Sequence, residues 1–107
     1  MNLNNEFQPI RDWAIERGLY EKGDIKTQCL KLQEEVGELA VSILKDKEAE
    51  FIDAIGDCVV VLTNLTELGN KHFGCQFSIE DCINEAYEVI KNRKGQMKNG
   101  TFKKDVI

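Results

Sequence analysis

Apolar residues recur at intervals of three and four along most of this chain, and no long stretch alternates between apolar and polar residues. The first spacing is typical of amphipathic helices, whereas alternation would indicate strands. The single proline, Pro9, stands near the start of the first periodic segment. The pattern therefore predicts an all-α fold with four helices, over about residues 5–17, 24–45, 47–68 and 78–93.

Residues with strong capping preferences mark where two of these helices begin. Asp24 precedes the second periodic segment and is expected to be its N-cap. Ser78 and Asp81 have the spacing of a capping box, with aspartate in place of the usual glutamate, and are expected to open the fourth helix.

Glycines mark where helices end. Gly18 is expected to end the first helix and Gly69-Asn70 the third, because glycine readily adopts the left-handed conformation that follows a helix. The last dozen residues, with two glycines among lysines, indicate an extended or loosely ordered segment. We therefore predict one domain over residues 1–94 and a basic C-terminal tail over residues 95–107.

The third segment, residues 47–68, differs from the second because its apolar residues occur all round the helix. Ile55 and Leu62 lie on one side, whereas Val61 and Leu68 lie on the opposite side. Such a helix is expected to be buried nearly all round. Three short partner helices supply too little cover for it, so we expect the chain to form a homo-oligomer.

Four carboxylates lie at helical spacing among residues that belong in a core: Glu35, Glu38, Asp53 and Asp57. Because a helix has about 3.6 residues per turn, each of the two helices carries its pair of acids on one face. Antiparallel packing of these helices would bring both pairs into one volume. Burying unpaired charges costs roughly several kcal/mol, and no run of Lys or Arg stands nearby, so the acids suggest a bound cation. The alternative is an ordinary solvated helix face.

The residue types favour a hard divalent ion. Carboxylate oxygens are the ligands that Mg²⁺ prefers, whereas zinc prefers nitrogen and sulfur. The chain has one histidine, His72, and its four cysteines show no C-x-x-C pair. A histidine-rich centre and a cysteine zinc site are therefore excluded, and we expect the cysteines to be reduced.

Composition excludes several other classes of function. The chain has 107 residues and a net charge of −5, which fits one domain and argues against binding a nucleic-acid polymer, because phosphate backbones require a basic surface. Its first residues lack the basic and apolar segments of a signal peptide, and no apolar run is long enough to span a membrane. We therefore expect a cytoplasmic protein with no membrane partner.

The acidic motifs carry a resemblance to a known family. Residues 34–38, Glu-Glu-Val-Gly-Glu, followed by Gly56-Asp57 and the apolar run behind it, resemble the MazG-like family of all-α nucleotide pyrophosphohydrolases. The similarity extends from residues 10–13, Ile-Arg-Asp-Trp, to the basic residues 91–94. It implies a four-helix bundle completed as a homodimer or homotetramer. It also implies hydrolysis of a nucleoside triphosphate to the monophosphate and pyrophosphate with Mg²⁺, for which Mn²⁺ is a substitute.

The second acidic motif departs from the family pattern, which has a glutamate three residues before the aspartate. When the chain is aligned on Asp57, that glutamate position is occupied by Ala54, and we expect Asp53 to take its place. The alternative alignment places the motif on Glu50 to Asp53, but the apolar run then starts late.

The resemblance also implies roles for the acids. Metal binding is implied for Glu35, Glu38, Asp57 and Asp53. Catalytic roles fall to Glu34, Glu35 and Glu38, with Glu34 positioning or deprotonating the attacking water. Glu34 has an alternative interpretation as a solvated surface acid.

Substrate binding is implied for residues outside the acidic motifs. Lys91, Arg93 and Lys94 are expected to bind phosphates, although cations there also complement the C-terminus of a helix. Trp13 is expected either to stack on a nucleotide base or to pack in the core.

Two other functions remain open. A phosphoribosyl-ATP pyrophosphohydrolase would use the same fold and the same acids. A helical module that has lost catalysis and only binds a partner or a nucleotide would account for Ala54.

Overall fold

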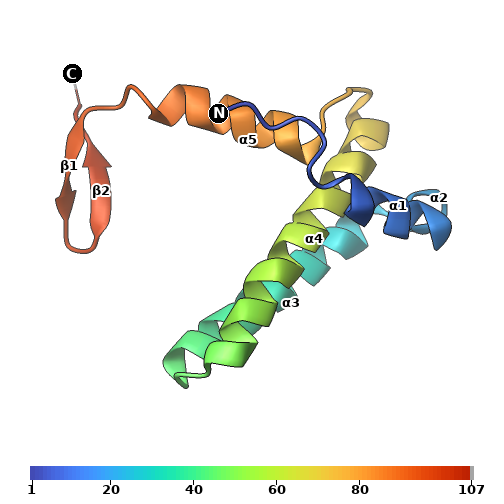
Figure 1. Cartoon of the computed structure of the whole chain (residues 1–107), viewed down its shortest axis with the longest axis horizontal. Coiled ribbons are helices and arrows are strands. Elements are labelled where there is room, and N and C mark those ends of the chain that lie inside the picture. The colour runs from blue at the N-terminus through green and yellow to red at the C-terminus, as the bar shows by residue number, and fades with distance from the viewer. Residues whose placement is uncertain (107) are drawn as a thin grey trace.

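Two long antiparallel helices, α3 and α4, organise the computed structural model, which describes residues 1–106 (Figure 1). Two shorter helices, α1 and α2, precede this pair, and α5 leads from it to a β-hairpin. The structure therefore has five helices and two strands, where the pattern predicted four helices. The elements are α1 (Gln8–Glu16), α2 (Leu19–Lys22), α3 (Ile25–Leu44), α4 (Glu48–Phe73), α5 (Ile79–Ile90), β1 (Gly95–Lys98) and β2 (Thr101–Lys104).

Both predicted N-terminal caps are present. The carboxylate of Asp24 accepts hydrogen bonds from the backbone N–H of Thr27, at 2.9 Å, and from its hydroxyl. At the start of α5, Ser78 Oγ accepts from the Asp81 N–H, and the Asp81 carboxylate accepts from the Ser78 N–H. These bonds satisfy N–H groups that have no partner within the helix, and so they fix where α3 and α5 begin.

The expected end of α4 at Gly69-Asn70 is wrong, because the helix continues to Phe73. It ends at Gly74, whose φ of 69° lies in the left-handed region. Asn70 instead holds the following loop: its side chain donates to the Phe77 carbonyl oxygen at 2.6 Å and accepts from the Phe77 N–H at 2.9 Å. A glycine within a helix costs only about 1 kcal/mol, which the packing of α4 readily exceeds.

The C-terminal tail is also more ordered than the sequence indicated. Strands β1 and β2 pair antiparallel, with Met97 opposite Phe102. Asn99 and Gly100 join them with φ values of 53° and 81°. Two successive positive φ values are the mark of a type I′ turn, for which Asn-Gly is the preferred sequence.

The face of α3 that packs against α4 carries polar as well as apolar residues. Glu35 and Ser42 are buried on this face and Leu32 and Leu39 are half-buried, whereas Val36 and Ile43 are exposed. The prediction that α4 is buried all round is wrong for a single chain. Its core side carries Ala54, Val61, Asn64 and Leu68, whereas five large apolar residues remain exposed on the rest of its surface: Phe51, Ile52, Ile55, Leu62 and Phe73.

A buried ion pair ties α1 to the start of α5. The Nη1 and Nη2 atoms of Arg11 donate to Oε1 and Oε2 of Glu80 at 2.7 and 2.8 Å. The Phe7 N–H donates to the same carboxylate at 2.9 Å. Glu80 is fully buried, so this bidentate contact joins residues 69 positions apart inside the molecule.

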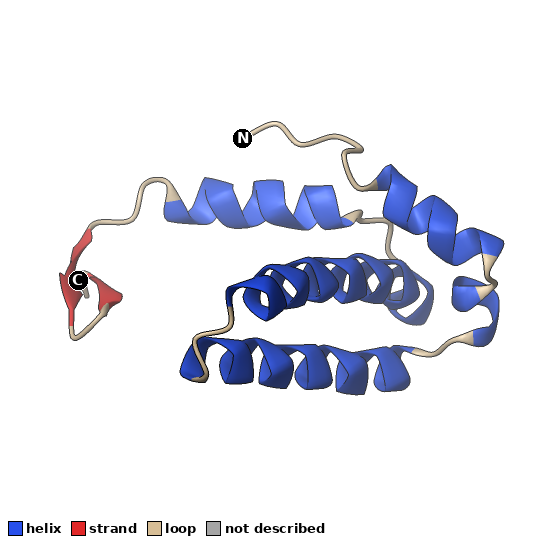
Figure 2. Cartoon of the chain, turned by 60° about the horizontal axis from the view of Figure 1, so that its bottom comes forward, coloured by secondary structure: helices blue, strands red, loops and turns tan. Residues whose placement is uncertain are grey.

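The molecule is more extended than its length requires. Its radius of gyration is 16.2 Å, whereas a compact domain of this size is expected near about 13 Å. The extension arises because α5 leaves the α3–α4 pair at one end and carries the hairpin away from it (Figure 2). Within the described residues, no helix combines the length and the apolar character that a membrane span requires.

Candidate metal centre

Three carboxylates from the two long helices form one cluster, which we call the acid site: Glu35, Glu38 and Asp57. Glu35 and Glu38 lie one turn apart on α3, and Asp57 lies on α4. One oxygen from each carboxylate lies within 4.8 Å of an oxygen from each of the others. Antiparallel packing thus brings together three of the four acids that the sequence singled out.

Glu35 lies in the interface between α3 and α4, with only 5% of its surface exposed. Lys31, one turn earlier on α3, places its Nζ 3.2 Å from Oε1 of Glu35. The second oxygen, Oε2, is buried and has no hydrogen-bond partner in residues 1–106. A buried acceptor without a partner costs roughly 1–3 kcal/mol, and more when it is charged. This oxygen therefore fits the role of a ligand to a cation.

Repulsion among the acids is visible in their pKa values. Partial burial raises the pKa of Asp57, and the neighbouring carboxylates of Asp53 and Glu35 raise it further. The charge of Glu35 is the main cause that raises the pKa of Glu38. Lys31 opposes this repulsion from the edge of the site, and its own pKa is raised, chiefly by its hydrogen bond to Glu35. Three carboxylates against one ammonium leave negative charge that a divalent cation would neutralise.

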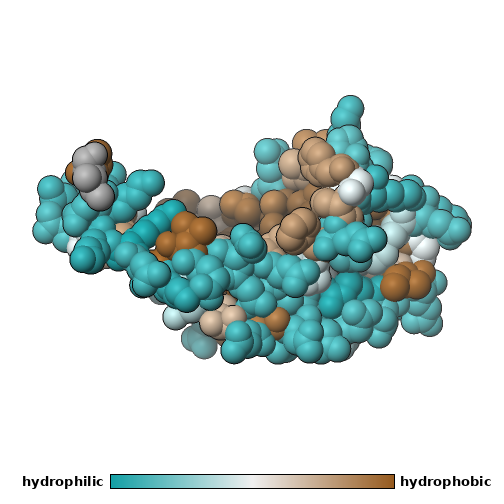
Figure 3. All heavy atoms as spheres, turned by 90° about the horizontal axis from the view of Figure 1, so that it is seen from above, coloured by the Kyte–Doolittle hydropathy of each residue, from teal (hydrophilic) through white to brown (hydrophobic). Residues whose placement is uncertain are grey.

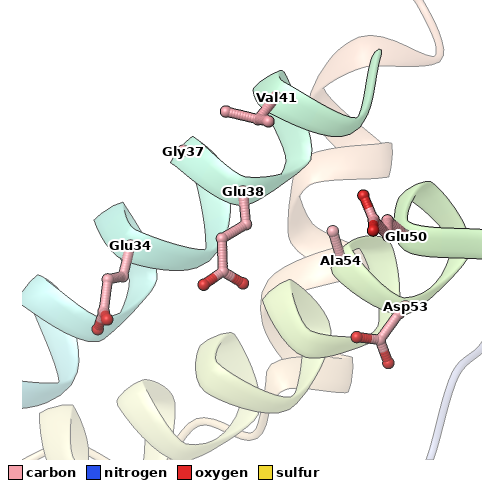
Figure 4. A pocket seen from close by; sticks show the side chains of 7 residues that line it. All are labelled: Glu34, Gly37, Glu38, Val41, Glu50, Asp53 and Ala54. Atoms are coloured by element: carbon pink, nitrogen blue, oxygen red, sulfur yellow. The ribbon is translucent and has the colours of Figure 1, made fainter. Parts of the chain in front are cut away.

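A cavity of about 510 Å³ opens beside the acid site, between α3 and α4 (Figure 4). Glu38 lines it from α3, and Glu50 and Asp53 line it from α4. Asp53 lies outside the group of three, although its charge reaches Asp57. Ala54 is 3% exposed and also lines the cavity, so a methyl group stands where the family pattern has a glutamate. The acid site consequently has exposed acids at its rim in place of a fourth buried carboxylate.

Glu34 lines the same cavity as Glu38, and both residues are exposed. Its Oε2 lies 3.7 Å from Lys31 Nζ, so one lysine contacts both Glu34 and Glu35. This position places an exposed, weakly paired carboxylate next to the acid site. It is compatible both with the expected role toward water and with the alternative of a solvated surface acid.

Trp13 belongs to a second cavity, of about 470 Å³, rather than to the core. Its side chain remains 46% exposed, and the Arg17 guanidinium lies 4.4 Å from the ring centroid. The same cavity is lined by Asp57 of the acid site and by Pro9 from α1. An aromatic face and a carboxylate of the acid site therefore border one space.

The basic residues at the end of α5 lie apart from the acid site. Lys91, Arg93 and Lys94 follow α5 and are exposed, and Lys91 pairs with Glu88 of the same helix. Among the described elements, α5 contacts α4 but not α3. Within one chain, Lys91, Arg93 and Lys94 are therefore not positioned beside the acid site.

Two contacts near the site were missed from the sequence. Lys31 was not singled out, although it stands four residues before Glu35, a spacing that pairs side chains on a helix. Asn64 is buried on α4 and accepts a hydrogen bond from the Tyr20 hydroxyl at 2.6 Å. Burial raises the pKa of Tyr20 to about 12, so its hydroxyl remains a donor that fastens α2 to α4. The separation of 44 residues gives no local signal for this contact.

Comparison with known proteins agrees with this arrangement. The family model for the MazG nucleotide pyrophosphohydrolase domain matches residues 24–97, which contain α3, α4, α5 and strand residues of β1. An uncharacterised 18.2 kDa protein from the rep–hol intergenic region of Haemophilus phage HP1 is 38% identical over 66 residues. The matched region is 62% of this chain but only 40% of the phage protein. No solved structure matches the chain.

Proposed function

Because this chain belongs to the family of MazG nucleotide pyrophosphohydrolase domains, we propose that it hydrolyses a nucleoside triphosphate between the α and β phosphates. The products would be the nucleoside monophosphate and pyrophosphate. The observation that carries the proposal is the buried Oε2 of Glu35, which has no hydrogen-bond partner among residues 1–106, on a side chain that clusters with Glu38 and Asp57. A carboxylate kept in this state is poorly explained by stability, because an apolar residue of similar size would avoid the cost of burial.

The acid site supports Mg²⁺ as the resident ion, with Mn²⁺ as a substitute. Among residues 1–106, the donors that cluster there are oxygens from Glu35, Glu38 and Asp57, with Asp53 at the rim of the neighbouring cavity and no nitrogen or sulfur ligand. Such donors suit hard divalent cations. When bound, the ion would neutralise phosphate oxygens and lower the pKa of a coordinated water.

The chain's own residues would then position the reactants. Glu34, exposed at the rim of the cavity, would accept the proton of a water whose oxygen bonds to one phosphorus of the α–β bridge. The bridging oxygen would leave with the other phosphorus. Trp13 would present its ring to the base in the second cavity, which Asp57 also lines.

We also propose that the working form is a homodimer or homotetramer. The exposed apolar residues of α4, together with Val36, Val41 and Ile43 of α3, form surfaces that a second copy would cover. In such an assembly, phosphate binding by Lys91, Arg93 and Lys94 would come from a neighbouring copy, because their own chain holds them away from the acid site.

The test is a pyrophosphate-release screen across canonical and modified nucleoside triphosphates and phosphoribosyl-ATP, with Mg²⁺, with Mn²⁺ and with chelator. We expect metal-dependent release that Asp57→Asn removes. Turnover of phosphoribosyl-ATP alone would assign the chain to the related enzyme. Because Ala54 stands at the glutamate position, a non-catalytic nucleotide-binding module is the second candidate. It predicts nucleotide binding by calorimetry without release from any compound.

A further inference from the structure

The β-hairpin has one apolar face that no other element among residues 1–106 covers. Met97 and Phe102 are direct cross-strand partners, so their side chains lie on the same face, and they are 66% and 46% exposed. The neighbouring pair, Gln96 and Lys103, lies on the opposite face because side chains alternate along a strand. Among the described elements, the two strands contact only each other. A two-stranded hairpin is marginal by itself in water, which indicates that this one is completed by another surface.

Charge is divided sharply between the hairpin region and the rest of the chain. Residues 91–107 contain six Lys or Arg against one Asp, whereas residues 1–90 contain eight against eighteen Asp or Glu. The two parts therefore carry net charges of +5 and −10. Opposite charges of this size favour association between the hairpin region of one molecule and the acidic body of another.

A surface with matching properties lies at the closed end of the α3–α4 pair, which we define as residues 41–55. It exposes large apolar side chains close to acids. Leu44 and Phe51 are exposed on either side of the connection between the helices, and Glu48 and Glu50 follow that connection. Phe51 and Glu48 also line a cavity of about 330 Å³ there. The carboxylates of this segment outnumber its two lysines.

A hairpin does not reach the closed end of its own chain. Helix α5 starts from the opposite end of α4, and neither strand contacts α3 or α4. Figure 1 shows the hairpin at the far end of α5, and Figure 3 shows a mostly hydrophilic surface at that end of the molecule. We propose that the hairpin of one copy docks on the closed end of a second copy, with Met97 and Phe102 against its apolar residues and the flanking lysines near its acids.

Photo-crosslinking tests this contact in the full-length chain without any nucleotide. Phe102 is replaced by p-benzoylphenylalanine, and ¹⁴N and ¹⁵N copies are mixed, so that mass spectrometry separates links within one copy from links between copies. Thr101, on the opposite face, carries the same probe as the matched control. We expect links between copies from position 102 into residues 41–55, and several-fold fewer from position 101. Links within one copy, links to another segment, or no links from position 102 would overturn the proposal.

Self-association gives the second measurement. The double variant Met97→Asp and Phe102→Asp should weaken association at least tenfold by analytical ultracentrifugation, whereas Gln96→Asp and Thr101→Asp, with the same added charge, should change it several-fold less. Circular dichroism should show unchanged helix content in both, because the strands contact no helix. Equal effects of the two variants would refute docking through the apolar face. These measurements do not depend on hydrolysis. If the wild-type protein formed the expected crosslinks but released no pyrophosphate, the proposed function would be rejected and the docking proposal would stand.

Discussion

Glu80 and Glu35 are both buried carboxylates, but they differ in their hydrogen-bond partners and in the charges of their neighbours. Glu80 receives two hydrogen bonds from Arg11 and one from the Phe7 backbone, and the Arg11 hydrogen bonds are the main cause that lowers its pKa to about 2. Glu35 has Lys31 beside one oxygen, and its other oxygen has no hydrogen-bond partner in the described part of the chain. Its neighbours Glu38 and Asp57 have raised pKa values. Burial alone therefore does not distinguish Glu80 from Glu35, whereas the number of hydrogen bonds that each carboxylate accepts does.

The largest expected effect comes from breaking the satisfied pair. Glu80→Gln keeps the shape of the side chain but leaves the Arg11 charge buried without its counter-ion, which should cost about 3–5 kcal/mol of unfolding free energy. Chemical denaturation followed by circular dichroism measures this. Glu88→Gln is the matched control, because Glu88 forms an exposed pair with Lys91 and should cost about 1 kcal/mol or less. Equal losses in the two variants would contradict the structural role of Glu80.

A substitution in the acid site should affect activity rather than stability. Glu38→Gln should reduce pyrophosphate release by roughly 100-fold or more, since even residues that only support metal ligands commonly contribute ten- to 100-fold. Its melting temperature in chelator should be no lower than that of the wild type, because Glu38 is exposed and loss of its charge relieves repulsion from Glu35. Glu21→Gln, an exposed acid on α2, serves as the control. Undiminished release from the Glu38 variant would remove the acid site from the mechanism.

The two sites should also respond to pH with opposite signs. The folded-state pKa of Glu80, about 2, lies below its ordinary value of 4.5, so its contribution to stability is complete above pH 4.5 and is lost as pH falls toward 2. The pKa values of Asp57 and Glu38 are raised, so without metal their ionisation disfavours the folded state, and this cost disappears as pH falls through those raised values.

Thermal unfolding in chelator across pH separates these contributions. Asp57→Asn should be more stable than the wild type at about pH 7, and the difference should shrink as the medium is acidified. Mg²⁺ should reverse the order by stabilising only the wild type. A variant that is less stable than the wild type in chelator would show that repulsion in the acid site is already relieved.

The smallest effect is expected from restoring the missing carboxylate. Ala54→Glu adds a fourth acid beside the cavity that Glu38 and Asp53 line, and should tighten Mg²⁺ binding on the order of several-fold. Isothermal calorimetry measures the affinity. Ala54→Gln has almost the same volume without the charge, so it isolates the electrostatic part. Identical affinities in the two variants would mean that position 54 does not face the ion.

Local signals predicted much of the fold from sequence. Asp24 and Ser78 cap helices because their side chains bond to backbone groups three residues away, which is information that a short stretch of sequence contains. Asn99-Gly100 is also a local signal, because Asn-Gly favours a hairpin turn. The surrounding lysines and glycines led instead to the prediction of a loosely ordered tail. The end of α4 was placed too early because Gly69 and Gly74 look alike in sequence, and only Gly74 adopts a positive φ.

Contacts between distant residues were less accessible. The sequence indicated that Glu35, Glu38 and Asp57 would converge, because helical spacing and one short connection suffice for that inference. It did not show that Glu35 is buried while Val36 and Ile43 are exposed, since apolar character alone would have placed Val36 and Ile43 inside and Glu35 outside. The pairing of Arg11 with Glu80 depends on how α1 and α5 meet, which no local pattern specifies.

Asp57 has a consequence for how this protein changes over evolutionary time. It belongs to the acid site and also lines the cavity of Trp13, so one side chain is shared by the acid cluster and by the cavity proposed for the base. A substitution that enlarges this cavity at Asp57 would also remove or move a carboxylate of the acid site. Under the proposed function, new base preferences should therefore arise through Pro9, Ile10 and Val60, the residues lining that cavity that the acid site does not share.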